Sequence, residues 1–253
     1  MARFYVPADQ IDEEKGQVYL TGADVNHFKN VLRARKGDKC EIVSNDGRRF
    51  RCAVIDISAD KILMSIESRS EGSLEPEIKI TLIQGIPKGE KTEFVIQKAV
   101  ELGAVEIIPA MCERTVVRFQ TEKDMDKKAA RWQKVAEEAA KQCGRDMIPK
   151  VERPVELSKI DFAGRYFRYA KIMPYENETE RTLRSAINDP DVRAKCISDG
   201  LMIFIGPEGG ISRAEYDFMT SHGFISVTLG KRILRTETAS IFALSAARYE
   251  FED

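Results

Sequence analysis

Leu201-Met202-Ile203-Phe204-Ile205-Gly206-Pro207-Glu208-Gly209-Gly210 is the stretch of sequence that decides the fold. Its first half is an unbroken apolar run with the length expected of a strand that is buried on both faces. The glycines of its second half let the backbone turn sharply, and a ligand can approach the main chain there with no Cβ in the way. Because ligands of open α/β sheets bind beyond the carboxyl ends of the strands, this bend is a candidate ligand site.

A helix is predicted directly after the bend. Ser212 and Glu215 have the spacing of a capping box, and Ile211 and Tyr216 have the spacing of a hydrophobic staple. These signals place the start of the helix at Ser212, and Gly223 is its expected end.

A second strand followed by a glycine comes next. We predict a strand over residues 225–229, a bend at Gly230, and an apolar helix over about 237–249. The phosphate-binding motifs Gly-x-x-x-x-Gly-Lys-Ser/Thr and Gly-x-Gly-x-x-Gly are both absent. Apolar walls are expected from Ile205, Leu229, Ile233 and Leu234. Two successive bends of bare main chain between such walls favour a flat, mostly neutral heterocycle such as adenine over a triphosphate.

Composition places the chain among ordinary globular proteins. Its 253 residues are 43% hydrophobic and 32% charged, enough for one large domain or two modest ones. No apolar run approaches the roughly 20 residues of a membrane span, and the first residues lack the apolar region of a signal peptide. The five cysteines are scattered without Cys-x-x-Cys spacing, and neither His27 nor His222 has metal-ligand spacing. We therefore expect reduced thiols in a cytoplasmic protein, with no membrane span and no metal site.

Three regions are predicted along the chain. Residues 1–72 have the pattern of a small, mostly β domain, residues 73–77 that of a polar linker, and residues 78–253 the strand–helix alternation of a parallel α/β sheet. In the first region we predict a short helix with Val25, Phe28 and Leu32 on its buried face, and strands over residues 3–6, 18–20, 39–43, 49–57 and 61–66. In the third we predict strands over residues 78–83, 105–109 and 169–173 and helices over residues 90–102, 126–143 and about 179–186. Residues 147–168 and most of 177–199 carry no clear pattern.

Basic residues gather in the first region although the net charge of the chain is −1. Between Lys29 and Arg51 there are eight basic residues against three acidic ones. Such a cluster is typical of a patch that neutralises phosphates, and it is equally typical of a solvated charged face. Charge alone leaves both interpretations open.

Several motifs resemble a known family. Ile205-Gly206-Pro207-Glu208-Gly209-Gly210 and Leu229-Gly230…Ile233-Leu234-Arg235-x-Glu237-Thr238-Ala239 are similar to the S-adenosylmethionine site of SPOUT methyltransferases, in particular the RsmE-type 16S ribosomal RNA (uracil-N3)-methyltransferases. In the first region, His27-x-x-x-Val31-Leu32-Arg33-x-x-x-Gly37-Asp38 resembles the signature of the PUA-like domain of that family. The resemblance covers nearly the whole chain.

The resemblance implies an architecture and a cofactor. It implies a PUA-like β-barrel followed by a parallel-sheet domain tied in a trefoil knot, although true knots are otherwise nearly absent from proteins. It also implies a pocket for S-adenosylmethionine, built by the knotted loops at the interface of a homodimer. The residues implied for this pocket are Met173, Pro174, Ile205, Gly206, Pro207, Gly209, Gly210, Leu229, Gly230, Ile233, Leu234, Thr238 and Ala239. A homodimer also agrees with the predicted last helix, which is apolar on nearly all sides and needs cover all round.

The implied reaction is methylation of N3 of a uridine in 16S ribosomal RNA, as free RNA or in the 30S subunit. Arg235 is the candidate cation that stabilises the base once its imide proton has left, and Glu237 is expected to orient Arg235 or to help remove the proton. The alternative is a purely structural ion pair between the two. The candidate RNA contacts are Arg3, His27, Arg33, Arg35, Lys88, Arg114, Arg118 and Arg145, for several of which surface ion pairs are an equally common role.

Three other functions remain open from the sequence. One is a SPOUT methyltransferase that acts on transfer RNA or on another base of ribosomal RNA. Another is a non-catalytic RNA-binding factor in ribosome assembly, which would bind no S-adenosylmethionine. The third is a nucleotide-binding metabolic enzyme, which would bind ATP in place of S-adenosylmethionine.

Overall fold

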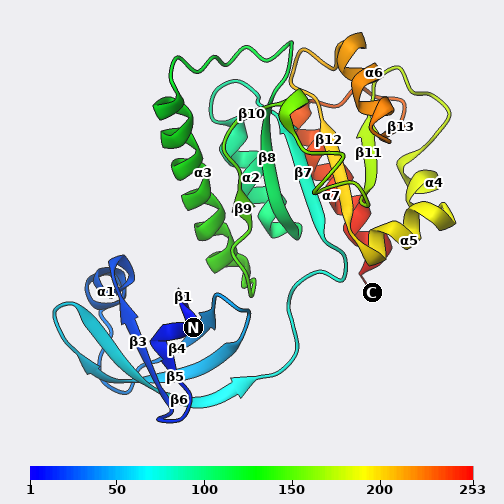
Figure 1. Cartoon of the computed structure of the whole chain (residues 1–253). Helices are drawn as coiled ribbons and strands as arrows, with labels where there is room; N and C mark the ends of the chain where they lie inside the picture. The colour runs from blue at the N-terminus through cyan, green and yellow to red at the C-terminus, as the bar shows by residue number, and fades with distance from the viewer. Residues whose placement is uncertain (253) are drawn as a thin grey trace. The chain divides into compact units, whose positions relative to one another are not determined.

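The computed structural model describes residues 1–252. The chain folds into two compact units: Met1–Glu75 with Ala140–Ile148, and Pro76–Ala139 with the chain from Pro149 onward (Figure 1). Segment 140–148 lies more than sixty residues beyond the predicted end of the first region, so no single cut of the chain describes this division. None of the helices within residues 1–252 combines the length and apolar character that crossing a membrane requires.

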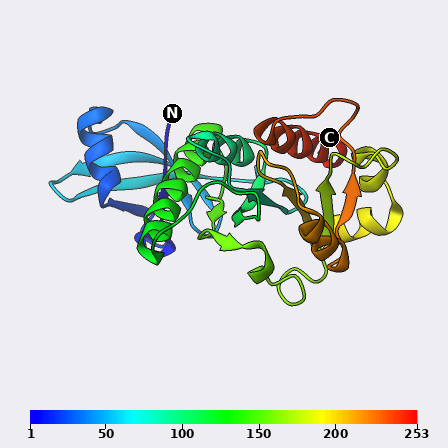
Figure 2. The same cartoon turned by 90° about the horizontal axis from the view of Figure 1, so that it is seen from above.

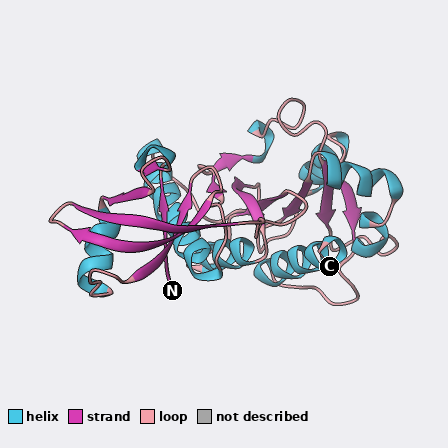
Figure 3. Cartoon of the chain, turned by 90° about the horizontal axis from the view of Figure 1, so that it is seen from below, coloured by secondary structure: helices cyan, strands magenta, loops and turns pink. Residues whose placement is uncertain are grey.

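The first unit is built on a six-stranded sheet in the order β1-β4-β5-β6-β3-β2, and this sheet curls on itself (Figure 3). Its neighbours pair antiparallel except for β1 and β4, which are parallel. Alternate side chains such as Phe4, Ile42 and Phe50 point into one shared core. The strands are β1 (Ala2–Val6), β2 (Ile11–Asp12), β3 (Gln17–Thr21), β4 (Lys39–Ser44), β5 (Arg49–Ile57) and β6 (Lys61–Ser70).

The predicted short helix of this unit is present in an unusual form. A 3-10 turn, η1 (Ala8–Gln10), comes first; the helix itself is α1 (Ala23–Asn26), which continues as a π-helix, η2 (His27–Val31). Val25 and Phe28 are buried as expected, but Leu32 is exposed. The prediction for Leu32 was wrong because the wider π-turn carries it away from the buried stripe.

Segment 140–148 belongs to the first unit through a buried polar cluster. The guanidinium of Arg3 donates to the carbonyls of Gly144 and Arg145, and the hydroxyl of Tyr5 donates to the Arg145 carbonyl at 2.6 Å. The carboxylate of Glu75 accepts the Asp146 amide at 2.7 Å. These hydrogen bonds satisfy main-chain groups that would otherwise be buried without partners.

The second unit is built on a parallel sheet in the order β10-β8-β7-β12-β11-β13, with β9 also paired to β8. Every pairing in it is parallel, as the alternation of strands and helices predicted. Of its two central strands, β12 is apolar throughout because both faces are covered, while β7 also carries the buried polar residues Thr81 and Gln84. The strands are β7 (Ile80–Gly85), β8 (Ala104–Met111), β9 (Lys150–Val151), β10 (Val155–Glu156), β11 (Ala170–Pro174), β12 (Leu201–Ile205) and β13 (Ile225–Val227).

Helices cover both faces of this sheet (Figure 2). One face is covered by α2 and α7, which also contact each other, and the opposite face carries α6. The helices are α2 (Lys91–Glu101), α3 (Glu122–Cys143), the 3-10 turn η3 (Leu157–Lys159), α4 (Leu183–Ile187), α5 (Pro190–Ser198), α6 (Arg213–Ser221) and α7 (Thr236–Phe251). The unreadable segments hold β9, β10 and η3, which are two or three residues long and so have no periodicity to detect. They also hold the nine-residue α5, whose two buried side chains, Val192 and Cys196, are too few to form a visible apolar stripe.

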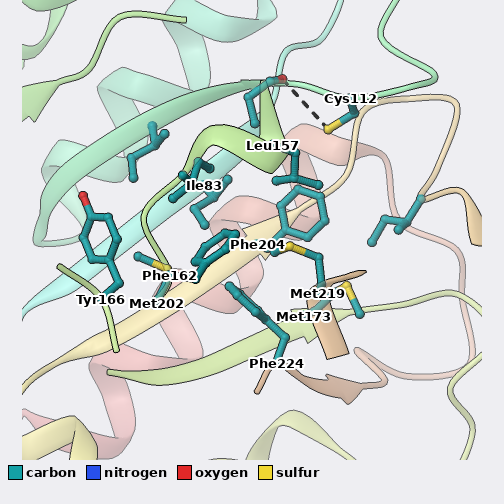
Figure 4. Close-up of a cluster of buried hydrophobic side chains, with 14 residues drawn as sticks. Ile83, Cys112, Leu157, Phe162, Tyr166, Met173, Met202, Phe204, Met219 and Phe224 are labelled. Atoms are coloured by element: carbon teal, nitrogen blue, oxygen red, sulfur yellow. Dashed lines mark hydrogen bonds between the residues drawn. The ribbon is translucent and has the colours of Figure 1, made fainter. Parts of the chain in front are cut away.

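A buried cluster packs α6 and the residues after it onto the sheet (Figure 4). Phe204 of β12 and Met173 of β11 are both fully buried in it, and Met219 of α6 packs against them. The rings of Phe162 and Phe224 meet edge to face at 5.3 Å. This packing holds the carboxyl ends of β11 and β12 at a defined position, from which the next loops depart.

Candidate functional site

The loops that follow three neighbouring strands, β12, β11 and β13, meet at the carboxyl edge of the second sheet. They enclose a cavity of about 900 Å³. Its wall is formed by residues between 174 and 182 after β11, between 205 and 211 after β12, and between 228 and 239 after β13, together with Lys91 of α2. A cavity of this size at this edge is where open α/β folds bind cofactors and other small molecules.

The bend after β12 needs glycine for space as well as for conformation. A Cβ built on Gly206 would lie 2.7 Å from Cγ1 of Ile211, and one on Gly209 would lie 2.8 Å from Cβ of Arg114. Gly210 has a φ of 73°, which other residues rarely adopt. The bend therefore presents main-chain atoms to the cavity with no side chain between.

The helix after this bend begins as the sequence predicts. The hydroxyl of Ser212 accepts the Glu215 amide at 3.2 Å, and the Glu215 carboxylate accepts the Ser212 amide at 2.9 Å. The same carboxylate also accepts the amide of Glu113 at 2.7 Å. The predicted capping box is confirmed, and it ties the loop after β8 to the cavity wall.

The bend after β13 leaves main-chain groups free. Within residues 1–252, the amides and carbonyls of Leu229, Ile233 and Leu234 make no hydrogen bond to the rest of the chain. Their side chains and that of Ile205 line the same cavity. Free donors and acceptors between apolar walls suit the edge of a flat heterocycle, which needs a few well-placed hydrogen bonds and a large apolar contact.

A buried polar network joins the two bends. The amide nitrogen of Gln84 at the end of β7 donates to the Thr236 hydroxyl at 2.9 Å, and that hydroxyl donates to the Gly206 carbonyl at 2.6 Å. The Ser240 hydroxyl donates to the Gln84 side-chain oxygen at 2.5 Å. All three side chains are buried, so the network fixes the start of α7 against the bend after β12. Sequence reasoning missed Gln84, although a polar residue in an apolar strand was a visible signal.

Apart from Lys91 and Glu208, which pair with each other at 3.3 Å, the charged residues of the cavity wall lie on two loops. Glu176 and Glu178 lie on the loop after β11, while Lys231, Arg232 and Arg235 lie on the loop after β13. The Ser226 hydroxyl donates to the carboxylate of Glu178 at 2.7 Å, and main-chain amides add further donors. These hydrogen bonds lower the pKa of Glu178 to about 2, so this carboxylate is a fixed negative charge.

Arg235 and Glu237 do not form the pair that the sequence suggested. Arg235 lies on the cavity wall and is exposed, and its side chain has no hydrogen-bond or ion-pair partner within residues 1–252. Glu237 lies off the wall, and its carboxylate is 3.4 Å from Nζ of Lys91. Lys91 also lies 3.3 Å from Glu208. The reason is geometric, because residues two apart at a helix start point to different sides.

Most residues predicted for the cofactor lie on the cavity wall. Met173 and Thr238 do not: Met173 is buried in the core cluster, and Thr238 is exposed outside the wall. The predicted residues on the wall are Pro174, Ile205, Gly206, Pro207, Gly209, Gly210, Leu229, Gly230, Ile233, Leu234 and Ala239.

The predicted RNA contacts fall into two groups. His27, Arg33 and Arg35 are exposed on the first unit, and Lys88, Arg114 and Arg118 are exposed on the second. Arg3 and Arg145 are instead largely buried in ion pairs with Glu41 and Glu75. Their guanidinium groups hold the polar cluster of the first unit together, which is a structural role.

Residues 1–252 contain no group of histidine, cysteine, aspartate and glutamate side chains that could hold a metal ion. Their five cysteines are free thiols. The wall of the cavity offers main-chain groups, hydroxyls and charged side chains to a ligand.

Known proteins resemble both units. A family model described as an RNA methyltransferase domain matches residues 74–248, and one described as an RNA methyltransferase PUA domain matches residues 20–67. The protein named ribosomal RNA small subunit methyltransferase E from Bacillus subtilis is 34% identical over 253 residues, which are 100% of this chain and 98% of that protein.

Solved structures are similar to this chain over nearly its whole length. A ribosomal RNA small subunit methyltransferase E from Neisseria gonorrhoeae, crystallised with S-adenosyl methionine, has a TM-score of 0.83 at 30% identity and covers 99% of this chain and 98% of its own. A methyltransferase from Legionella pneumophila, solved with the same cofactor, also has a TM-score of 0.83 at 30% identity, over 98% of this chain and 97% of its own.

Proposed function

Because this chain belongs to the family of RNA methyltransferases, we propose that it transfers the methyl group of S-adenosylmethionine to N3 of one uridine in 16S ribosomal RNA. Methyl transfer to small-subunit ribosomal RNA is supported by the activity for which its relatives are named, and the uridine N3 by the motifs that resemble the RsmE-type enzymes.

One observation carries the proposal: the cavity wall consists of bare main chain where a cofactor would lie. The space that a Cβ on Gly206 or Gly209 would need is already occupied by neighbouring side chains, so both positions must stay glycine. Leu229, Ile233 and Leu234 offer amides and carbonyls that make no other hydrogen bond within residues 1–252. These groups fit the adenine and ribose of S-adenosylmethionine. Bound there, the cofactor supplies an electrophilic methyl group on a sulfonium.

Arg235 is the proposed catalytic residue. Uracil N3 carries an imide proton, which passes to solvent water during the reaction, and its loss leaves a negative charge on the ring until N3 takes the methyl group. An exposed guanidinium on the cavity wall, without a carboxylate partner, stabilises such a charge. Glu237 lies in the first turn of α7, and its carboxylate pairs with Lys91 of α2. We therefore assign Glu237 the role of positioning the start of α7, which follows Arg235.

We further propose a division of labour along the chain. Residues 1–72, together with segment 140–148 of the same unit, bind RNA, residues 73–77 connect, and the remainder of residues 78–253 holds the cofactor in a knotted fold. The protein acts as a homodimer through α7, which exposes Phe242 and Tyr249 although it belongs to a packed helix layer. Its reaction takes place in the cytoplasm, where the proposed ribosomal substrate is made.

The central experiment incubates the protein and labelled S-adenosylmethionine with 16S RNA or with 30S particles and then maps the modified base. We expect label at N3 of one uridine. Label at another base of ribosomal RNA, no label with either substrate, or label only in a parallel incubation with transfer RNA would overturn the proposal.

A variant tests the role of Arg235. Arg235→Ala should lower the methylation rate by about 10²–10³-fold and leave the affinity for S-adenosylmethionine unchanged in calorimetry. Arg213→Ala is the control, because Arg213 is an exposed arginine paired with Asp217 on α6. Full methylation by Arg235→Ala would remove Arg235 from the reaction.

A further inference from the structure

The segment that leads from η2 to β4 has an unusual backbone. The π-helix η2 ends with the Leu32 amide donating to the His27 carbonyl at 3.1 Å, and the Ala34 amide then reaches back to the Phe28 carbonyl at 3.1 Å. Arg33 has a φ of 54°, and it is the one residue other than glycine with positive φ in residues 1–252. Single π-turns and strained non-glycine residues persist mainly where function requires them.

This backbone turns two aliphatic side chains toward solvent. Val31 is 65% exposed and Leu32 is 45% exposed. The segment beneath them is held firmly, because the Phe28 ring packs 4.7 Å from the Phe4 ring and the Gly37 amide donates to the Val54 carbonyl at 2.8 Å. The exposure of Val31 and Leu32 is therefore a fixed feature of the surface.

Unpaired cations surround the two aliphatic side chains. Lys29, Arg33 and Arg35 are exposed, and none of their side chains has an ion pair or a side-chain hydrogen bond within the described residues. The next two lysines along the chain differ, since Lys36 pairs with Asp56 at 2.8 Å and Lys39 pairs with Glu67 at 3.0 Å. Of the eight basic residues between Lys29 and Arg51, four have no ion pair within the described residues, and three of these four, Lys29, Arg33 and Arg35, flank Val31 and Leu32 in the chain; the fourth is Arg51 on β5.

We propose that Val31 and Leu32 pack against an unpaired base of the RNA substrate while Lys29, Arg33 and Arg35 bind the phosphates on either side. The proposal rests on the proposed function for the choice of RNA as the occupant. Three unpaired cations attract a polyanion, and the exposed side chains of Val31 and Leu32 can pack against the flat apolar face of a base. Stacked bases of a duplex hide their faces, so the occupant is a single-stranded segment or a loop. Apolar side chains such as leucine insert between the base steps of bent DNA, so an aliphatic side chain can pack on the face of a base that is not covered by its neighbour.

Leu32→Ser tests the aliphatic contact, with Leu74→Ser as the matched control. Leu74 is 55% exposed on the same unit but lies outside the segment. The probes are a single-stranded oligouridine and a fully paired RNA hairpin of the same length, and fluorescence anisotropy measures their affinity across salt concentrations. We expect Leu32→Ser to weaken binding of the single strand about tenfold, with an unchanged salt slope and an unchanged affinity for the hairpin.

Arg33→Gln separates the charged contact from the apolar one. It should lower the salt slope of single-strand binding by about 0.7, because one phosphate contact is lost. Wild-type affinity in Leu32→Ser, an equal loss for both RNAs, or a preference of the wild type for phosphatidylserine vesicles over oligouridine would overturn the proposal. Circular dichroism shows whether each variant keeps its fold.

The two proposals can fail separately. Single-strand binding that depends on Leu32 in a protein without methylation activity would overturn the proposed function and leave this inference standing. Methylation of 16S RNA by a protein whose RNA binding is insensitive to Leu32 would overturn this inference and leave the proposed function standing.

Discussion

Substitution of Gly85 by alanine tests whether the main-chain position of the bend after β12 determines cofactor binding. Gly85 ends β7, and a Cβ there would lie 2.5 Å from the Pro207 nitrogen, 2.6 Å from the Pro207 Cδ and 2.9 Å from the Gly206 carbonyl carbon. Ordinary contact begins at 3.4 Å, so Pro207 would have to retreat by about 0.9 Å. The atoms in the way belong to backbone and a proline ring and cannot rotate aside.

The structure limits that retreat. The Gly206 carbonyl is held by the Thr236 hydroxyl at 2.6 Å, and Thr236 is held in turn by Gln84. Overpacking of this kind costs about 1–3 kcal/mol. If the strain appears as displacement of the bend, the affinity for S-adenosylmethionine falls about 5- to 150-fold, since 1.4 kcal/mol corresponds to a factor of ten.

Calorimetry with S-adenosylmethionine measures the effect, and thermal unfolding shows how much of the strain appears as lost stability. Gly164→Ala is the control, because its added Cβ would meet only the Asp161 carboxylate, which accepts the amides of Gly164 and Arg165 at 2.9 Å each and lies outside the cavity wall. Strain at that position should lower Tm without changing the cofactor affinity. Cofactor affinity within twofold of the wild type, with an unchanged Tm, would show that the bend moves freely and that its main chain does not set the affinity.

Three further predictions concern the same unit. Gln84→Leu should lower the free energy of unfolding by about 1–3 kcal/mol in urea titrations, because its buried partners lose their hydrogen bonds; no loss would mean that the network is dispensable. Glu178→Gln should lower Tm at neutral pH, and the difference in Tm between wild type and variant should shrink as pH falls from the ordinary pKa of 4.5 toward about 2. The reason is that a carboxylate whose pKa is lowered in the folded state stabilises the fold only while it is ionised. A Tm difference that is still as large at pH 2 would contradict this cause. Phe242→Glu should give a monomer in analytical ultracentrifugation at micromolar concentration while Phe167→Glu does not, since Phe242 lies on α7 and Phe167 is exposed elsewhere; a dimer in both variants would place the interface away from α7.

Local patterns were enough for the elements with strong signals. The apolar run Leu201–Ile205 is β12 with the predicted bounds, and the capping box begins α6 at Ser212. Both succeed because their causes lie within a few residues: a doubly covered strand must be apolar throughout, and a cap bonds to an amide three residues away. The glycine bends were found for the same reason.

Contacts between distant segments could not be predicted in this way. Segment 140–148 joins the first unit, Gln84 of β7 anchors Thr236 of α7, and Glu237 pairs with Lys91 rather than with its near neighbour Arg235. Each depends on where separate strands and helices come together, and no local spacing encodes that meeting. The exposure of Leu32 is of the same kind, because it results from a π-turn that the helical spacing of its apolar residues does not reveal. By itself the sequence determined which residues bend the chain and which must be buried. Only the tertiary structure decided which side chains face one another across the cavity, because the distances between the cavity-lining loops follow from the packing of the whole sheet.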